Sequence, residues 1–311
     1  MNDAVRIGTR GSKLALVQAE RVRGALQSKH AGLKTEIIVI KTRGDRILDS
    51  PLSQIGGKGL FIREIEQALV AGRIDVAVHS LKDLPTALPP ELTLGGVLAR
   101  EDPRDALISG RGCSFSDLKA GERIGTSSLR RRAQLLKANP ELEVNDIRGN
   151  VETRLDKLQK GLYDALVLAA CGLQRAGYEQ FVSEYLDPEL MLPAVCQGII
   201  GMESRKQDNR INDLLAGICH PSTLRIAEAE RIFLNRLEGG CQVPIGCLAT
   251  DGDGRGVVTG LVASLDGTQI VRRSREGEVG NLPRIAEELA EEVLENGGAE
   301  ILASIRKHLD E

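Results

Sequence analysis

One short sequence decides the fold, because it occurs twice. Residues 6–12 read RIGTRGS, and residues 123–128 read RIGTSS. Both copies place an apolar strand before Gly-Thr and a Ser near the start of the next helix, where serine is a favoured N-cap. A second pair, residues 75–78 and 164–167, begins with Asp and continues as an apolar strand. The two pairs predict two similar domains, although stretches this short also recur by chance.

Outward from these copies, strands and helices alternate over the first two thirds of the chain. Residues 12–28, for example, have an apolar stripe with helical spacing, between apolar strands at 5–8 and 35–40. The last third has a helix pattern at 223–237, strand patterns at 245–250, 256–265 and 268–275, and helix patterns from 281 to 309. Alternation is typical of α/β domains with largely parallel sheets, and strands followed by helices indicate a smaller α+β domain.

Composition excludes several classes of protein. The chain has 311 residues with a net charge of -3, no Trp, three Tyr and four Phe, which argues against a nucleic-acid partner. No apolar run approaches the roughly 20 residues of a membrane helix, and the polar start lacks the core of a signal peptide. We therefore expect a cytoplasmic protein with no membrane partner, and a monomer. The six cysteines form no C-x-x-C pair, and Cys219-His220 lacks further ligands, so no metal site is expected.

Basic residues gather in the second domain although the whole chain is slightly acidic. They are Arg130, Arg131, Arg132, Arg148, Arg154 and Arg175. Helix N-termini favour anions, and the planar guanidinium group suits carboxylates and phosphates alike. The cluster therefore indicates a small polyanionic ligand near the strand-to-helix turns. Simple helix capping by the same Ser and Thr residues is the alternative.

Three further stretches could carry chemistry. Residues 56–59, GGKG, are either a surface loop or a lid from which Lys58 reaches an anion. Asp83 follows an apolar strand at the edge where α/β sheets bind ligands, so it could stabilise a cation or move a proton, or simply pair with Lys82. Cys241 stands between two glycines and a proline-containing turn, where an accessible thiol could act as a nucleophile. His79 and Cys171 are expected to be packed and inert.

With these residues in view, the chain resembles the porphobilinogen deaminase family over nearly its whole length. Matching segments are residues 7–12, 41–45, 56–61, 79–86, 101–105, 124–131, 148–155 and 240–246. The resemblance implies an α/β fold of three domains: residues 1–98 with 199–217, residues 99–198, and residues 218–311. The first two would be similar and resemble periplasmic binding proteins, with a cleft between them, and the third would be a smaller α+β domain.

The resemblance also implies a reaction. Four porphobilinogen molecules would condense, each losing ammonia to give an electrophilic cation, onto a dipyrromethane cofactor joined by a thioether to Cys241. Water would then release hydroxymethylbilane. Asp83 is similar to the family's catalytic acid. The positions similar to those that bind cofactor or substrate are Arg10, Ser12, Lys58, Phe61, Ser80, Lys82, Thr126, Ser128, Arg130, Arg131, Arg148, Arg154, Arg175 and Gln197.

The sequence departs from the family pattern at Cys196, where Gly is commoner, and in the apolar residues Leu81 and Leu84. Cys196 is expected to alter local packing or add an oxidation-sensitive thiol. The main rival interpretation is a non-enzymatic, two-lobed anion-binding protein. Such a protein would use the arginine cluster but would have no need of Cys241.

Overall fold

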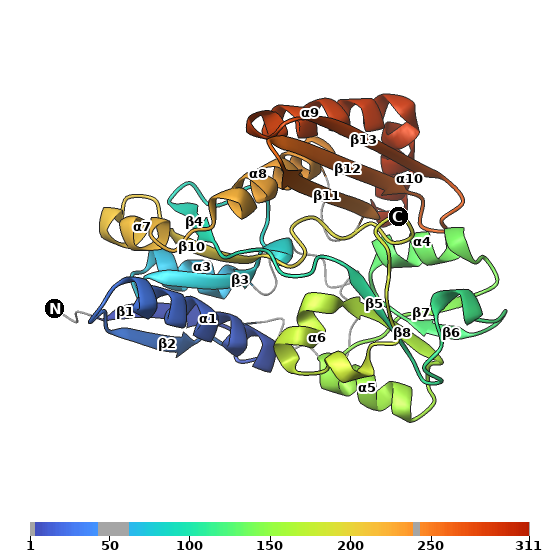
Figure 1. The fold of residues 1–311 in the computed structure, drawn as a ribbon, viewed down its shortest axis with the longest axis horizontal. Coiled ribbons are helices and arrows are strands. Elements are labelled where there is room, and N and C mark those ends of the chain that lie inside the picture. Colours follow the sequence, from blue (N-terminus) through green and yellow to red (C-terminus); the bar gives the residue numbers. More distant parts are fainter. Residues whose placement is uncertain (1–3, 43–61, 239–242, 311) are drawn as a thin grey trace. The chain divides into compact units, whose positions relative to one another are not determined.

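The computed structural model describes residues 4–42, 62–238 and 243–310. It divides into two compact units (Figure 1). The first comprises Met1–Glu101 and Ile199–Leu224, and the second comprises Asp102–Gly198 and Arg225–Glu311. The border between them falls inside helix α8 (Pro221–Arg236).

The first unit is built on a five-stranded sheet with the order β2-β1-β3-β10-β4. Its strands are β1 (Val5–Thr9), β2 (Thr35–Val39), β3 (Val76–Ser80), β4 (Leu92–Val97) and β10 (Ile200–Arg205). Its helices are α1 (Lys13–Lys29), α3 (Arg63–Val70) and α7 (Asn209–Ala216). The strands β1, β2 and β3 run parallel, whereas β10 pairs antiparallel with both β3 and β4. The apolar stripe of α1, including Val22 and Leu26, is buried against β1 and β3.

The second unit contains another five-stranded sheet, with the order β7-β6-β8-β5-β9. Its strands are β5 (Asp105–Ser109), β6 (Arg123–Gly125), β7 (Glu143–Asn145), β8 (Ala165–Ala169) and β9 (Glu184–Tyr185). Its helices are α4 (Leu129–Ala138), α5 (Val151–Gln159) and α6 (Ala170–Ala176). Again three neighbouring strands are parallel, and β5 pairs antiparallel with β8 and β9.

The two sheets match strand for strand, which confirms the predicted duplication. The repeated RIGT stretches fall on β1 and β6, and the repeated Asp-led stretches lead into β3 and β8. An arginine–aspartate ion pair also lies at the same position in the two sheets. Arg6 Nε donates to Asp75 at 2.9 Å, and Arg123 Nε donates to Asp164 at 3.0 Å. In both pairs the arginine backbone N–H also donates to the same carboxylate. The short repeated stretches in the sequence therefore reflect a structural duplication and not a chance match.

The C-terminal part of the second unit is an antiparallel sheet with two long helices. It consists of β11 (Ile245–Gly252), β12 (Arg255–Ala263), β13 (Ile270–Glu278), α9 (Leu282–Val293) and α10 (Ala299–Asp310). Asp253 and Gly254 both have positive φ, as a two-residue hairpin turn requires. Asp253 and Gly254 therefore form the turn between β11 and β12. The α/β class with a smaller α+β C-terminal part is confirmed.

Glycine at position 267 fits a close contact within the second unit. Gly267 has a φ of 72°, and a Cβ atom there would lie 2.2 Å from the carbonyl oxygen of Ala133. The hairpin between β12 and β13 can therefore pack on α4 with no side chain at this position. Near it, Ala133, Leu192 and Leu261 form a small buried cluster.

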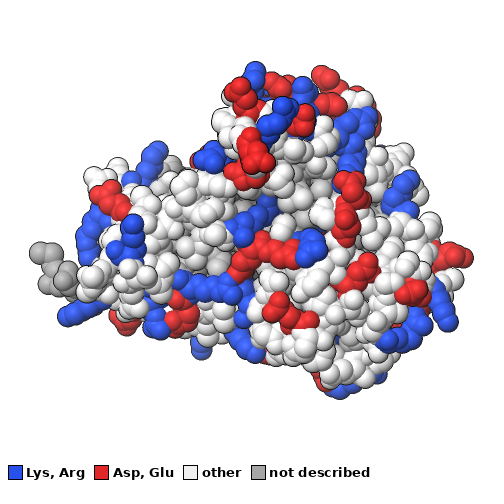
Figure 2. Space-filling model, in the orientation of Figure 1, with Lys and Arg blue, Asp and Glu red and all other residues white. Residues whose placement is uncertain are grey.

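Some predicted boundaries were wrong by a few residues. The strand expected to end at 275 continues to Glu278, whereas the helices expected from 281 to 309 are present as α9 and α10, on either side of Gly297. None of the helices among the described residues has the length and apolar character needed to span a membrane. On the face that Figure 2 shows, basic and acidic side chains are intermixed over the C-terminal sheet and helices. Ion pairs in this part of the chain, such as Arg275–Glu288 and Arg273–Glu292, join side chains of opposite charge.

Candidate active site

A fully buried carboxylate organises the second unit. Asp105, the first residue of β5, is 0% exposed. One of its oxygens lies 2.8 Å from Nη2 of Arg130, and the other lies 2.7 Å from Nη2 of Arg131. The side-chain amide of Gln197 donates to the same carboxylate at 2.8 Å. Burial alone would raise the pKa of Asp105, but the two guanidinium groups hold it well below its usual range.

The charges at Asp105 do not balance. Arg130 and Arg131 are both buried, yet they share one carboxylate. The Nε atoms of both arginines are buried and have no hydrogen-bond partner in the described part of the chain. Burial lowers the pKa of Arg130, and Asp105 offsets that effect in part. Buried unpaired charge and unsatisfied donors are costly, so this cluster is suited to an additional anion.

A third guanidinium adds to this positive charge. Arg154, on α5, donates from Nε to the carbonyl oxygen of Gly149 at 2.9 Å. Burial, together with the nearby charge of Arg131, lowers the pKa of Arg154 to about 10. No ion pair joins Arg154 or Arg148 to an acidic residue among those described. The structure thus brings Arg130 and Arg131 together at a single carboxylate, with the charge of Arg154 near Arg131.

Arg175, like Arg130, Arg131 and Arg154, donates to a backbone carbonyl. It is buried, and its Nη2 donates to the backbone carbonyl of Gly198 at 3.0 Å. Part of its hydrogen-bonding capacity therefore supports the segment that leads toward β10. The sequence shows no signal that separates this arginine from its neighbours.

The hydroxyl groups at the strand-to-helix turns do cap helices. Ser12 Oγ accepts from the backbone N–H of Ala15 at 3.3 Å, and Ser128 Oγ accepts from that of Arg131 at 3.4 Å. Thr126 Oγ1 accepts from the N–H of Ser128. Capping and anion binding are compatible here, because α4 has no acidic residue in its first turn and carries two arginines there. Positive side chains at the positive end of a helix favour the binding of an anionic ligand.

The first unit presents Asp83 at the end of a strand. Residues Leu81–Asp83 form a 3-10 turn directly after β3. Leu81 and Leu84 are buried and anchor this turn, whereas Asp83 is exposed and Lys82 is half-buried. Ser80 Oγ accepts from the side-chain amide of the buried Gln18 at 2.6 Å. The turn therefore displays Asp83 and Lys82 while its apolar neighbours hold it in place.

His79 is a packed residue, as expected, and lies at the end of β3 beside Glu203 of β10. Its Nε2 is 3.2 Å from a carboxylate oxygen of Glu203, and both side chains are buried. Lys58, Phe61 and Cys241 lie outside the described residues. In the described part of the chain, no group of three His, Cys, Asp or Glu side chains is placed to hold a metal ion.

Sequence reasoning missed the organising role of Asp105. The residue appeared only as part of a matching segment, because a single Asp at the start of an apolar strand gives no sign of its partners. The three side-chain partners of its carboxylate, Arg130, Arg131 and Gln197, all lie far along the chain. Its position before three apolar strand residues was the available signal, since an acidic side chain that enters a buried strand needs a counter-charge.

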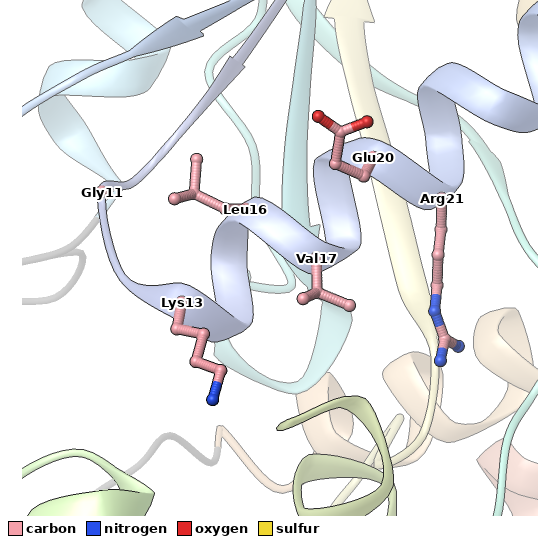
Figure 3. Close-up of a pocket in the computed structure, with 6 residues that line it drawn as sticks. All are labelled: Gly11, Lys13, Leu16, Val17, Glu20 and Arg21. Atoms are coloured by element: carbon pink, nitrogen blue, oxygen red, sulfur yellow. The ribbon is translucent and has the colours of Figure 1, made fainter. Parts of the chain in front are cut away.

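A shallow hollow of about 590 Å³ lies along the first turns of α1. It is lined by Gly11, Lys13, Leu16, Val17, Glu20 and Arg21. Figure 3 shows Lys13, Val17 and Arg21 projecting from the same side of the helix, as their spacing of four residues requires. The hollow borders the N-cap Ser12 but contains neither Asp83 nor the arginines of the second unit.

Comparison with known proteins assigns the whole chain to one family. Residues 5–213 match the family model described as "Porphobilinogen deaminase, dipyromethane cofactor binding domain", and residues 224–296 match the C-terminal domain of the same family. The chain is 48% identical over 301 residues to the porphobilinogen deaminase of Syntrophobacter fumaroxidans, covering 97% of each chain. It is 51% identical to that of Geobacter metallireducens, covering 97% of this chain and 94% of the relative.

Solved structures give a much weaker likeness. The VFT2 domain of Bordetella pertussis BvgS overlays with a TM-score of 0.42 and 15% identity, covering 70% of this chain and 87% of that domain. The strand order of the sheets, and not this overlay, defines the fold. The sequence comparisons, in contrast, are extensive and consistent from one end of the chain to the other, and on their basis the chain belongs to the porphobilinogen deaminase family.

Proposed function

We propose that this protein is a porphobilinogen deaminase, a transferase of tetrapyrrole biosynthesis. It condenses four porphobilinogen molecules with loss of ammonia and releases hydroxymethylbilane. The observation that carries this function is the pair of buried guanidinium groups, Arg130 and Arg131, that share the single carboxylate of Asp105, with the charge of Arg154 near Arg131. Each pyrrole unit bears an acetate and a propionate, so a growing chain of pyrroles supplies the anions that this cluster lacks.

The dipyrromethane cofactor of the matched family domain fits the described residues. The two buried Nε donors of Arg130 and Arg131, which have no partner among the described residues, suit the carboxylates of a bound group. The cofactor, attached through a thioether to Cys241, supplies the carbon at which the pyrrole chain grows. Arg130, Arg131, Arg148 and Arg154 hold carboxylates and orient the chain, and Thr126 and Ser128 support the same turn.

Asp83 is the catalytic group of this proposal. It is exposed at the end of β3, next to Lys82, on a turn that buried leucines anchor. Its carboxylate stabilises the positive charge that develops when ammonia leaves the substrate, and it accepts hydrogen bonds from pyrrole N–H groups. Ser80, Lys82, Arg10 and Ser12 bind substrate or cofactor in the same unit. Arg175, Gln197, Lys58 and Phe61 complete the proposed binding set.

The proposal includes three domains, residues 1–98 with 199–217, residues 99–198, and residues 218–311. Support comes from the pairing of β10 with β3 and β4 and from the separate C-terminal sheet. We also propose a cytoplasmic monomer that binds neither membranes nor nucleic acid. Light scattering of the holoenzyme as it elutes from a size-exclusion column tests the monomeric state. A mass of twice 33.6 kDa would contradict a monomer.

The central experiment is incubation of the purified protein with porphobilinogen, followed by identification of the product and the intact protein mass. We expect hydroxymethylbilane, and a protein mass above that of the chain by a covalent dipyrromethane. A protein with the unmodified chain mass that binds carboxylates but releases no product would instead be a non-enzymatic anion-binding protein.

A further inference from the structure

The loop between β7 and α5 is held by an unbroken series of hydrogen bonds to its carbonyl groups. The oxygen of Asn145 accepts from the N–H of Thr126, and that of Asp146 accepts from the Tyr163 hydroxyl at 2.6 Å. The next carbonyl, of Ile147, accepts from the Ser127 hydroxyl at 2.7 Å. Three successive carbonyls are thus fixed from residues outside the loop.

The series continues into the helix. The carbonyl of Arg148 accepts from Nζ of Lys157 at 3.1 Å, and that of Gly149 accepts from Nε of Arg154 at 2.9 Å. The side chain of Asn150 caps α5 by accepting from the N–H of Thr153. Loops usually satisfy such groups with water. Here side chains do so, which fixes the backbone on either side of Arg148.

Ser127 has a special place in this series. Its hydroxyl donates to the Ile147 carbonyl and accepts from the Ile147 N–H at 3.0 Å. The hydroxyl therefore acts as donor and as acceptor toward one backbone residue, Ile147, which precedes Arg148. The side chains of its two neighbours in the turn act elsewhere, because the Ser128 hydroxyl caps α4 and the Thr126 hydroxyl accepts from the Ser128 N–H.

Gly149 explains why the loop needs support from its carbonyl side. Its φ is 110°, and a Cβ atom would lie 2.6 Å from the Thr153 side chain. Glycine is required there, and glycine loses more conformational freedom on folding than any other residue. Without outside contacts the loop would sample several conformations, and Arg148 would move with it.

We infer that Ser127 and Tyr163 are positioning residues, whose hydroxyl groups hold the 146–149 backbone so that Arg148 and Arg154 meet ligand carboxylates in one geometry. The inference rests on the proposed roles of these two arginines. It concerns binding of carboxylates distant from the reacting carbon, so loss of the hydroxyls weakens binding more than it slows the chemical step.

The test is the double variant Ser127→Ala/Tyr163→Phe, prepared as holoenzyme, with Tyr178→Phe as a matched control. The Tyr178 hydroxyl donates to a carboxylate oxygen of Glu152, on α5, at 2.9 Å, so this variant also removes one tyrosine hydroxyl beside α5. We expect the double variant to raise KM for porphobilinogen about fivefold to tenfold, with kcat changed less than about twofold. Hydrogen exchange of peptides covering 145–151 should accelerate, and the control should change neither quantity.

Two further variants make the outcome decisive. Ser127→Thr retains a hydroxyl and should restore most of the KM and exchange protection, and Tyr163→Phe alone serves if the double variant does not fold. A normal KM and normal exchange in the hydroxyl variants, with a raised KM in Arg148→Ala, would overturn this inference alone. A normal KM in Arg148→Ala and Arg154→Ala as well would overturn the proposed arginine roles. Intact mass reports cofactor attachment in each variant independently of turnover.

Discussion

Arg154 and Arg131 carry like charges near one another in the second unit. Burial, and then the charge of Arg131, lower the pKa of Arg154 to about 10. Like charges are brought together in a folded protein where something else compensates them. Asp105 compensates only one of the guanidinium groups that surround it, so the remaining positive charge is available to a polyanionic ligand.

Removal of single arginines should stall pyrrole addition. Arg148→Ala and Arg154→Ala each remove charge-assisted hydrogen bonds to carboxylates, and we expect kcat/KM to fall at least about tenfold. Intact mass spectra of the variants during turnover should show incompletely assembled or incompletely extended pyrrole chains. Arg255→Ala is the control, since Arg255 is exposed and pairs with Glu276 on the C-terminal sheet. Wild-type product yield in both test variants would mean that the cluster is an ordinary charged surface.

Asp83→Asn should retain the fold and lose most turnover. Asp83 is exposed on its turn, and the buried Leu81 and Leu84 carry the local packing, so melting should change little. The neutral amide cannot balance a developing positive charge or take up a proton. Steady-state rates and thermal melting of the same preparation check both statements. Near-normal turnover would remove Asp83 from the mechanism.

Cys241→Ala should yield a chain that never acquires its covalent cofactor. The thiol is the proposed attachment atom, and among the other cysteines described, Cys171, Cys196 and Cys247 are buried. We expect the intact mass to equal that of the unmodified variant chain, with no hydroxymethylbilane formed. Cys113→Ala is a suitable control, because Cys113 is partly accessible but has no role in the proposal. An active, normally modified C241A protein is the result that rules out this attachment.

Asp105→Asn should destabilise the protein strongly. The substitution leaves the buried Arg130 and Arg131 without a counter-charge, and breaking a buried ion pair from one side costs about 3–5 kcal/mol. Urea denaturation measures the free energy of unfolding. Asp156→Asn provides the comparison, because its pair with Lys160 is exposed and should matter by less than about 1 kcal/mol. Equal stabilities of the two variants would contradict the organising role of Asp105.

The duplicated ion pairs predict a pH dependence of stability. Burial would raise the pKa of Asp75, but hydrogen bonds from Arg6 and Arg205 lower it from 3.8 to about 2. A carboxyl with a lowered folded-state pKa stabilises the fold above its unfolded pKa and loses that contribution as pH falls. Asp75→Asn should therefore cost about 1–2 kcal/mol at pH 7 and close to nothing near pH 2.

Asp164→Asn is the matched control for that measurement. Asp164 makes the same bonds to Arg123, and its pKa is also lowered, first by the Arg123 side chain. However, its side chain is 35% exposed against 12% for Asp75, and it lacks a second arginine partner. We expect a smaller loss of stability over the same pH range. A loss at Asp164 as large as that at Asp75 would show that burial and the second arginine are unimportant.

Much of the fold could be predicted because its signals are local. The RIGT repeats, the Ser caps and the apolar periodicity located both α/β sheets and the duplication, since strand and helix periods depend on neighbours in the chain. The end of β13 at Glu278 was missed because the ends of elements depend on packing partners and on single backbone conformations.

By itself, the sequence determined the class of fold, the family and the residue types that meet anionic pyrroles. Only the tertiary structure decided that Asp105 neutralises part of the arginine cluster, that Arg175 supports a backbone carbonyl, and that Ser127 fastens the loop next to Arg148. The physical reason is that charge balance and hydrogen-bond satisfaction are properties of groups that meet in space. The spacing of residues along the chain cannot show which guanidinium groups are paired within the fold and which can bind an additional anion.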